Sequence, residues 1–408
     1  MSTLAGVGFS ENPDSYTAGY EAARAALQQA SIDTCHLLLV FATSKHDAGA
    51  FYTGLRAAAG AQAQIVGGSA IGIITNDQLG YDGYQVGVAA FESNDIQFDL
   101  FHEPGLPGNE TNVGEKLGHQ LTANEWVGEP NILLMYDSMN HTTQPPRMNM
   151  ATPLLEGLEK AFVTSGHHYP PRLAGVGQCG DTPHEPVSQW LNGVIERYSA
   201  QAVVFSGNVR MDTVVLHGCK PAGAYHTITK SEGPMVLEID NRPALDVIAE
   251  LLGPDSGYAT TEYRFFVTLG VNKGDKFGPF RAEDYANRLC CGVDEERGGL
   301  IMFEPDLVPG TQVQLMRRSI DFEYIGQHIK ELLASTNDRQ PFFALYIDCA
   351  GRASAYCGSE GEEAAEVQRA IGRDIPLLGM YSGVEIAQVG KNLQPLDWSG
   401  VLCLFSYQ

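Results

Sequence analysis

The sequence predicts an α/β protein with two lobes of mixed, mostly helix-covered β-sheets, built from repeated strand–helix–strand units. Two observations support this prediction. Short runs of continuous apolar residues recur along the chain, and such runs are typical of strands that are buried on both faces. Amphipathic segments with helical spacing lie between these runs, and this alternation favours sheets that are covered by helices.

Three stretches of the chain repeat one order of elements: an apolar strand, a polar loop, a helix, a glycine-rich strand or turn, and a closing strand. The opening strands are HLLLVFATS, NILLMYDS and PFFALYIDC, and the closing strands are YQVGVAAF, AQAVVFSG and SGVLCLFS. The helical patterns are FYTGLRAAAG, PLLEGLEKAF and EEAAEVQRAIG, and the glycine-rich segments are QIVGGSAIG, LAGVGQCGD and PLLGMYSGVEIA. Repetition of this kind indicates duplicated α/β units with a pseudo-symmetric arrangement.

A segment of different character separates the second and third repeats. Its expected strands lie in VVLHGCKPAGAYHTIT, MVLEID, RFFVTLGV, GLIMFEPDL and QVQLMRR. Amphipathic spacing predicts helices at RPALDVIAELLG, which ends at Gly253, and at SIDFEYIGQHIKELLA. The chain is expected to divide near GNVRMD, into an N-terminal domain over residues 1–210 and a C-terminal domain over residues 211–408.

Charge and hydropathy disfavour several classes of function. The 408 residues carry a formal net charge of −23, whereas nucleic acids and anionic membranes are bound by basic surfaces. The sequence lacks the run of roughly 18 apolar residues that a membrane-spanning helix needs. The N-terminus MSTLAGVGFS has no basic region followed by an apolar block, so it does not resemble a signal peptide. We therefore expect a soluble cytoplasmic protein that binds neither nucleic acid nor membrane.

The eight cysteines form no known metal or haem motif. CxxC pairs are absent from the sequence, which leaves a zinc ribbon or a thioredoxin-like site without support, and the absence of CxxCH excludes c-type haem attachment. Most of these cysteines lie in or beside apolar runs such as LCCGV and VLCLF. In a reducing cytosol such cysteines are expected to be small buried side chains.

The stretch DCAGRASAYC directly follows an apolar run and combines sulfur, charge and glycine. The planar fork of Arg352 suits a carboxylate, its charge would lower the pKa of an adjacent Cys349, and Gly351 allows close approach of the backbone. Three interpretations stay open: residues that end a strand, contacts to a ligand, or a catalytic thiol at Cys349, which needs a base. A disulfide between Cys349 and Cys357 is disfavoured in a cytosolic protein.

Equivalent glycine-rich loops, GGSAIG and GMYSG, follow strands in the first and third repeats. Ligands of α/β proteins bind at the carboxyl ends of buried strands, where backbone N–H groups and a serine hydroxyl hold a carboxylate. The candidate contacts are Gly68, Ser69, Tyr381 and Ser382. The alternative is tight turns with close helix–sheet packing, and neither loop is a Walker A or dinucleotide-binding fingerprint. The long polar loop DSMNHTTQPPRMNM is a further candidate, as a lid or binding loop.

Histidines near cysteines raise the alternative of a haem or metal site, because haem iron takes His or Cys and histidine is the commonest neutral metal ligand. The histidines are His141, His167, His168 and His184 around Cys179, and His217 and His226 around Cys219. The sequence contains no HExxH motif, and HHYPP is typical of an exposed loop. We expect no resident cofactor, with haem as the alternative.

Several segments, taken in order, resemble the FIST family, with an N-terminal and a C-terminal FIST domain in tandem over almost the whole chain. The N-terminal likeness lies in GVGFS, LLLVFATS, IVGGSAIG and GYQVGVAAF. The C-terminal likeness lies in HGCKPAGAYHTIT, MVLEIDNRPALDVI, GGLIMFEPDLVPGTQVQLMRR, DCAGR and LLGMYSGVEIA. The family usually has Gly directly before the Glu that corresponds to Glu385, whereas this chain has Val384 there. The turn is therefore expected either to use Gly383 or to be built differently.

The resemblance implies a sensor and not an enzyme. Its ligand would be a small molecule, such as an amino acid or another carboxylate, and Cys349, Gly351, Arg352 and Glu385 would face it. Related domains are fused to histidine kinases or cyclic-dinucleotide domains, so the expected partner is a separate histidine kinase or cyclic-dinucleotide enzyme, as in a two-component system. Two alternatives remain: a haem-binding nitric-oxide sensor that controls a histidine kinase, and an enzyme that uses the Cys349 thiol.

Overall fold

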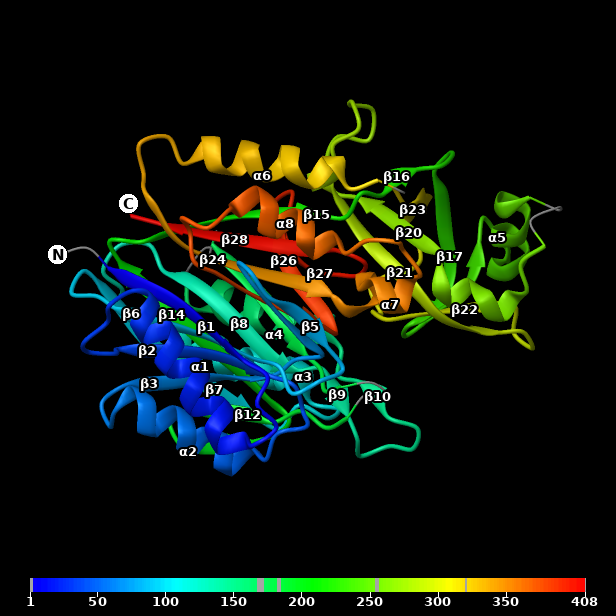
Figure 1. The fold of residues 1–408 in the computed structure, drawn as a ribbon. Helices are drawn as coiled ribbons and strands as arrows, with labels where there is room; N and C mark the ends of the chain where they lie inside the picture. The colour runs from blue at the N-terminus through cyan, green and yellow to red at the C-terminus, as the bar shows by residue number, and fades with distance from the viewer. Residues whose placement is uncertain (1–2, 167–171, 182–184, 254–256, 320, 408) are drawn as a thin grey trace.

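The computed structural model describes residues 3–166, 172–181, 185–253, 257–319 and 321–407. Three units with one order of elements make up the body of the described fold: outer strand, helix, first strand, helix, second strand, hairpin and closing strand (Figure 1). Unit one consists of β1 (Leu4–Ser10), α1 (Ser15–Gln29), β2 (Leu37–Ala42), α2 (Ala48–Ala59), β3 (Gln64–Ser69), β4 (Gly72–Thr75), β5 (Leu79–Tyr81) and β6 (Val86–Glu92).

Units two and three repeat this order with additions. Unit two consists of β7 (Ile96–Pro104), α3 (Glu110–Thr122), β8 (Asn131–Asp137), the extra hairpin β9 (Met139–Asn140) and β10 (Arg147–Met148), α4 (Ala151–Thr164), β11 (Leu173–Gln178), β12 (Gln189–Leu191), β13 (Val194–Glu196) and β14 (Ser199–Gly207). Unit three consists of β15 (Arg210–Leu216), α6 (Glu323–Ser335), β24 (Pro341–Cys349), η3 (Ala350–Arg352), α7 (Ser354–Cys357), α8 (Glu363–Ile371), β25 (Leu377–Ser382), β26 (Val384–Val389), β27 (Asn392–Leu396) and β28 (Gly400–Ser406).

The three units exchange hairpins in a cycle. Each unit forms a sheet in the order outer, closing, first and second strand, for example β1-β6-β2-β3, with the first and second strands parallel. The remaining edge of each second strand pairs with the hairpin of another unit. Thus β12 of unit two pairs with β3, β26 of unit three pairs with β11, and β4 of unit one pairs with β25. Every sheet is therefore completed by a neighbouring unit.

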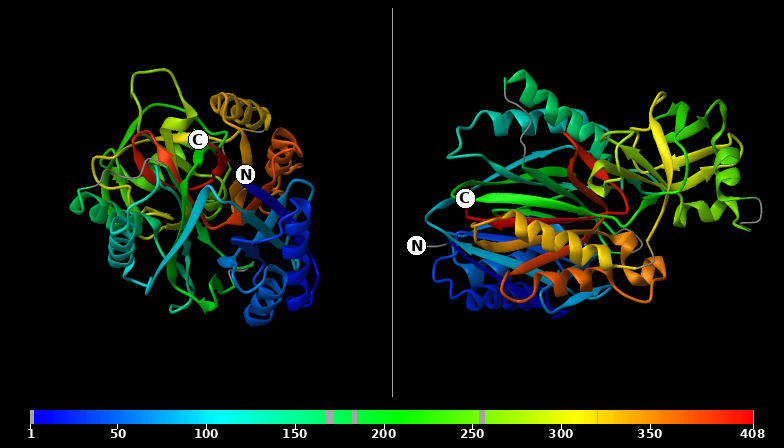
Figure 2. Two further views of the ribbon diagram at one scale, coloured as in Figure 1. Left: turned by 90° about the vertical axis from the view of Figure 1, so that its left-hand side faces the viewer. Right: turned by 90° about the horizontal axis from the view of Figure 1, so that it is seen from above.

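The inner faces of the three sheets enclose a common apolar core, and paired helices cover their outer faces, as the view along the body shows (Figure 2, left). One phenylalanine from each closing strand enters this core. The rings of Phe91 and Phe205 are 6.0 Å apart and those of Phe205 and Phe405 are 4.9 Å apart, measured between centroids. The apolar runs of the sequence thus fill both faces of each sheet.

Glycines bring the helices of units one and two into backbone contact. A Cβ atom on Gly54 of α2 would lie 2.0 Å from the carbonyl oxygen of Tyr16 in α1, and one on Gly157 of α4 would lie 1.9 Å from that of Thr111 in α3. The sequence pattern predicted one helix per unit and missed α1 and α3. The buried face of α1 consists largely of alanine and glycine, so it shows little of the apolar contrast that marks an amphipathic helix.

An insert over residues 220–317 lies between β15 and α6. It projects from the end of the body opposite to the two termini (Figure 1; Figure 2, right). Its strands form a further antiparallel sheet with its own apolar core. Its elements are β16 (Lys220–Pro221), β17 (His226–Glu232), β18 (Met235–Ile239), β19 (Arg242–Pro243), α5 (Ala244–Leu252), η1 (Thr260–Phe265), β20 (Thr268–Asn272), η2 (Ala282–Asp284), β21 (Tyr285–Asp294), β22 (Gly299–Met302) and β23 (Gln312–Arg317).

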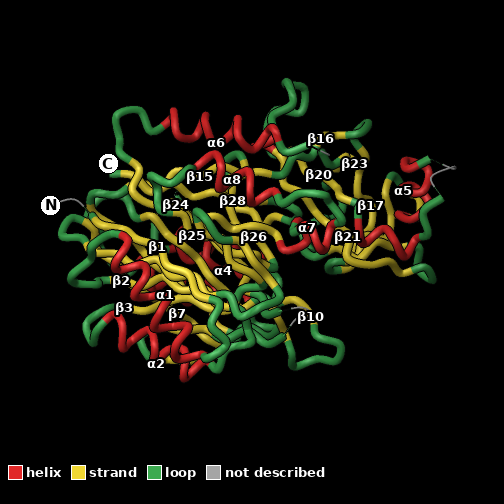
Figure 3. The backbone as a smooth tube through the Cα atoms, in the orientation of Figure 1, coloured by secondary structure: helices red, strands yellow, loops and turns green. Residues whose placement is uncertain are grey.

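The predicted α/β class and the repeated units are confirmed, with strands in the centre of the body and helices outside (Figure 3). The predicted boundary after residue 210 falls at the start of β15, and hairpin exchange continues across it. Within the described residues, every helix is too short or too polar to cross a membrane.

Candidate ligand-binding site

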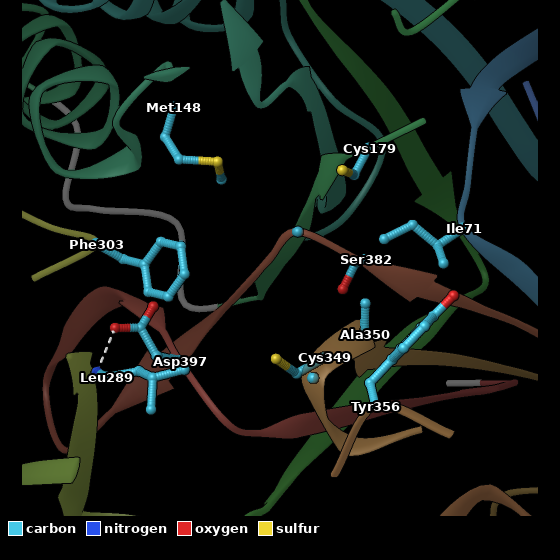
Figure 4. A pocket seen from close by; sticks show the side chains of 12 residues that line it. Ile71, Met148, Cys179, Leu289, Phe303, Cys349, Ala350, Tyr356, Ser382 and Asp397 are labelled. Carbon is cyan, nitrogen blue, oxygen red and sulfur yellow. Dashed lines mark hydrogen bonds between the residues drawn. The ribbon is translucent and has the colours of Figure 1, made fainter. Parts of the chain in front are cut away.

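A cavity of about 260 Å³ lies where the carboxyl ends of the parallel strands of the three units meet. Unit one contributes Ile71, unit two contributes Cys179 and unit three contributes Ser382. Leu289 and Phe303 of the insert close the cavity from the other side (Figure 4). Because ligands of α/β proteins bind at such strand ends, this cavity is the candidate site.

The lining of the cavity is apolar and rich in sulfur, with one acidic side chain among its described residues. Sulfur comes from Met148, Cys179 and Cys349, and the acid is Asp397. Lys, Arg and His are absent from the described lining. One carboxylate oxygen of Asp397 accepts a hydrogen bond of 2.8 Å from the backbone N–H of Leu289. Burial raises the pKa of Asp397 to about 6, so near neutral pH it is charged. The cation that opposes this shift, Arg288, lies outside the lining.

Cys349 and Ser382, which end the parallel strands β24 and β25, lie at the same level in the sheet and both border the cavity. The Ser382 hydroxyl oxygen is 2.9 Å from the carbonyl oxygen of Asp348 and 2.7 Å from Oε1 of Glu385. A hydroxyl has one hydrogen, so both contacts are hydrogen bonds only when Glu385 is protonated and donates. Burial raises the pKa of Glu385 well above its usual range, which agrees with a neutral acid.

The Cys349 thiol is also held in its neutral form. Burial raises its pKa well above the usual value. Gly351 borders the cavity beside it. A thiol in such surroundings is a poor nucleophile, because the thiolate is the reactive form.

Arg352 lies behind the cavity wall and is fully buried. Its guanidinium forms ion pairs with Asp348 and Glu363, and it donates to the carbonyl oxygens of Leu216 at 2.8 Å and Trp398 at 3.2 Å. Each nitrogen of the guanidinium thus contacts a group of unit three. A ligand contact by Arg352 stays a prediction from the sequence, and the position of the side chain does not support it.

Two family models match the sequence over most of its length: the FIST N domain over residues 36–242 and the FIST C domain over residues 244–388. The chain belongs to the FIST family. The resemblance seen in DCAGR and the other segments is thereby confirmed. FIST domains are sensory domains that bind small ligands in signalling proteins.

Curated relatives of this FIST chain are remote. An uncharacterized protein of Mycobacterium bovis is 24% identical over 183 residues, which are 44% of this chain and 46% of that protein. One of Mycobacterium tuberculosis is 24% identical over 196 residues, 47% of this chain and 50% of that protein. One of Methanocaldococcus jannaschii is 22% identical over 152 residues, 36% of this chain and 29% of that protein. The matches thus span about half the length of these relatives or less.

Among solved structures, a cyanuric acid hydrolase from A. caulinodans is similar over 50% of this chain and 71% of that chain. The sequence identity is 11% and the TM-score is 0.27. A similarity this low carries no argument about fold or function.

The other FIST residues predicted at the site lie outside the cavity lining. The side chain of Gln178 fills the space beside Gly68, and Ser69 accepts a hydrogen bond of 2.9 Å from the backbone N–H of Ser188. Tyr381 is buried and donates to Glu362 at 3.0 Å. These residues join the sheets and helices around the site, and their ligand contacts remain predictions.

The departure from the usual FIST ending is accommodated at Gly383. This residue connects β25 to β26, and Val384 begins β26 as a buried strand residue. A Cβ atom on Gly383 would lie 2.7 Å from the Ser138 hydroxyl oxygen and 3.3 Å from Cβ of Cys179. The bend therefore uses Gly383 for close contact between units two and three.

The histidines considered as FIST haem ligands do not converge on the cavity. His217 is buried, with one ring nitrogen 2.8 Å from the carbonyl oxygen of Ala282 and the other accepting from the N–H of Cys219. His226 pairs with Asp240. His167, His168 and His184 lie outside the described residues, within which no cluster of His, Cys, Asp or Glu suits a metal ion. Among the described residues, the contacts of His217 and His226 do not fit a histidine-ligated haem.

Sequence reasoning missed much of the lining. Asp397 and Leu289 lie outside the segments that resemble FIST domains, and Phe303 lies in such a segment but was not predicted to contact a ligand. Met148 lies in the long polar loop that was a candidate, and Tyr356 lies in the DCAGRASAYC stretch. Packing between distant segments, and not a local pattern, brings these residues together.

Proposed function

We propose that this FIST protein is a non-catalytic cytoplasmic sensor that binds a small molecule in the cavity at the strand ends. The cavity carries this proposal, because all three units and the insert meet around it. Occupancy would change how the insert packs against the body. A separate signalling partner, such as a histidine kinase or a cyclic-dinucleotide enzyme, would then recognise the altered surface.

The lining favours a ligand with an apolar body and a neutral or cationic polar group. Phe303, Leu289 and Ile71 offer apolar contact, while Asp397 and Ser382 offer polar contact. A buried carboxylate on the ligand would need a cation or several N–H donors, and the described lining contains no basic side chain. Of the ligands expected from the sequence, an amino acid would therefore bind through its ammonium group, and a simple organic acid is disfavoured.

A sensing role also fits the chemistry of the site better than catalysis does. The Cys349 thiol has a raised pKa, and the described lining contains no histidine that could act as its base. The neutral Glu385 carboxyl and the Ser382 hydroxyl are engaged with each other. These groups form a fixed wall for a ligand.

A thermal-shift panel of amines, amino acids, neutral apolar compounds and organic acids tests the proposal, because a ligand that binds the native state raises the midpoint of unfolding. Ala350 borders the cavity, so Ala350→Leu should remove the shift by filling it. Ala61→Leu makes the same change at an exposed position and should keep the shift. Asp397→Asn retains an acceptor for Leu289 and should weaken amines more than neutral ligands.

Two results would contradict the proposal. One is a panel in which no compound stabilises the protein. The other is a shift that Ala350→Leu leaves unchanged, which would place the ligand elsewhere. A shift produced only by organic acids would contradict the expected ligand class but leave the sensing role standing.

A further inference from the structure

A second cavity, of about 340 Å³, lies where the insert joins the body. Two chain segments are adjacent there, one leading from β15 into the insert and one returning to α6. A 2.9 Å hydrogen bond joins them, from the N–H of Ser319 to the carbonyl oxygen of Gly218. The cavity is lined by Gly218 and by five residues with polar side-chain groups, three of them basic: Lys220, Arg317, Arg318, Ser319 and Asp321. We call this space the hinge cavity.

Lys220 and Arg317 stand directly opposite each other in the antiparallel pair of β16 and β23. Directly opposed residues project on the same face, so two exposed positive charges face one another here. Neither side chain forms an ion pair with any described carboxylate, including Asp321 in the same lining. Like charges in this arrangement destabilise a sheet.

The two opposed positive charges contrast with the acidic composition of the chain. The sequence holds 49 acidic residues against 26 Lys and Arg, so carboxylates are plentiful. Some other exposed cations do pair with carboxylates, as Lys116 does with Glu103 at 3.0 Å and Lys160 with Glu115 at 2.8 Å. The hinge cavity thus concentrates positive charge on a protein that is otherwise strongly negative.

Arg318 adds a third cation in a fixed orientation. Its guanidinium lies 3.3 Å from the ring centroid of Trp398 and donates to the hydroxyl of Thr268 at 3.2 Å. Burial lowers its pKa to about 10, so it stays charged near neutral pH. A guanidinium held on an aromatic face is oriented in advance for an oxyanion.

We propose that the hinge cavity binds a small phosphate-bearing anion through Lys220, Arg317 and Arg318. Phosphate oxygens accept from a lysine ammonium and from planar guanidinium forks, and the site would supply both. The volume is of the order of the roughly 300–1,000 Å³ of small-molecule sites. The negative charge of the rest of the surface argues against a nucleic acid, whose backbone would need basic residues well beyond this cavity.

The same cavity offers an optical reporter. Trp398 is close to both Arg318 and Gly351: a Cβ atom on Gly351 would be 3.5 Å from the indole ring. The chain has three tryptophans, so a Trp398→Phe variant identifies the part of the fluorescence that reports on this site. An anion that binds Arg318 should change the fluorescence contributed by Trp398.

The test titrates the full chain with inorganic phosphate, pyrophosphate and ADP at constant ionic strength, by calorimetry and by tryptophan fluorescence. Saturable binding of at least one probe is expected, and Lys220→Ala/Arg317→Ala should weaken it about tenfold or more. Lys116→Ala/Lys160→Ala removes the same charge elsewhere and should leave it unchanged. Tighter binding of ADP would point to a nucleotide source, and tighter binding of pyrophosphate to an inorganic one.

The proposal is overturned if none of the probes binds saturably. It is also overturned if both double variants weaken binding equally, because the loss of affinity would then reflect the overall charge of the protein and not this cavity. Because all four substituted residues are exposed, the variants are expected to fold. Circular dichroism and the unfolding midpoint verify this before titration. The outcome does not depend on the proposed sensing cavity, which Ala350→Leu tests separately.

Discussion

The guanidinium Nε of Arg352 lies 3.1 Å from Oδ1 of Asp348, and both side chains are fully buried. Glu363 of α8 forms an ion pair with the same guanidinium. The hydroxyl of Tyr324 in α6 donates a hydrogen bond to Glu363 and accepts one from Arg352. The arginine of DCAGR is therefore the centre of an internal ion-pair network. This network joins the end of β24, next to the cavity, to the two helices that cover the third sheet.

Arg352→Met should destabilise the protein by about 3–5 kcal/mol, because it leaves two buried carboxylates without a cation. Urea unfolding measures the change. Arg369→Met is the matched control: Arg369 is exposed and pairs with Glu366 on α8, so its loss should cost less than about 1 kcal/mol. A loss below about 1 kcal/mol for Arg352→Met would show that the network does not hold the fold together.

Stability should fall as the pH rises from about 5 to 8. Burial raises the pKa of five carboxyls, to about 7 for Asp137, Glu304 and Asp348 and to about 6 for Asp181 and Asp397. Across this range these carboxyls hold more protons in the native state than in the unfolded state, so raising the pH favours unfolding. Buried His217, whose pKa is lowered to about 4, opposes this trend below about pH 6.5, but the carboxyls outnumber it. The unfolding midpoint across pH 5–8 tests this, and a midpoint that rises with pH would contradict it.

Asp397→Asn should flatten that pH dependence around pH 6 and raise the stability at pH 8. The asparagine keeps an acceptor for the N–H of Leu289 but carries no charge to bury. The pKa of Asp397 implies a gain of up to about 3 kcal/mol at pH 8. Denaturant unfolding of both proteins at pH 5 and pH 8 measures the change in unfolding free energy. An equal change at the two pH values would mean that the charge of Asp397 does not cause it.

Cys349 should react with iodoacetamide at least about tenfold more slowly than a free cysteine at pH 7.5, because its thiolate is scarce. Mass spectrometry after timed labelling of the native protein measures the rate. Half-buried Cys357 of the same stretch serves as the internal comparison. Rapid labelling of Cys349 would instead support the alternative of a thiol enzyme.

Phe205→Ala should cost about 3–5 kcal/mol, since it empties space in the core that the three sheets share. Combined with Phe405→Ala, whose ring lies 4.9 Å away, the effects should not add. Phe277→Ala is the control, because its side chain is 91% exposed. Additive losses in the unfolding free energy would mean that the two rings act independently.

Much of the architecture could be predicted from the sequence, because each unit contains the same apolar strands and the same order of elements. The exchange of hairpins could not. Residues such as Gly72 and Val384 mark the start of a hairpin strand, but a local pattern does not say which sheet will accept it. That choice depends on packing between segments that are far apart in the chain.

The site was predictable to a similar degree. Cys349, Gly351 and Ser382 border the cavity, as strand-end positions in an α/β fold would suggest. Arg352 looked equally suited to a ligand, but two acidic partners inside the protein occupy it, and only one of them lies in the same motif. Asp397 and Phe303 were missed because tertiary packing alone brings them to the strand ends.

The cyclic exchange of hairpins has a consequence for how the chain folds as it is synthesised. β25 pairs with a hairpin made long before it, and the N–H of Leu377 bonds to Asn76, which lies 301 positions earlier. The sheet of unit two is complete only when β26 pairs with β11, and β26 is synthesised near the end of the chain. Pairings this distant are expected to form slowly. We therefore expect separately expressed FIST N and FIST C segments to expose open strand edges and to aggregate or reassociate, since neither contains all the strands of its own sheets.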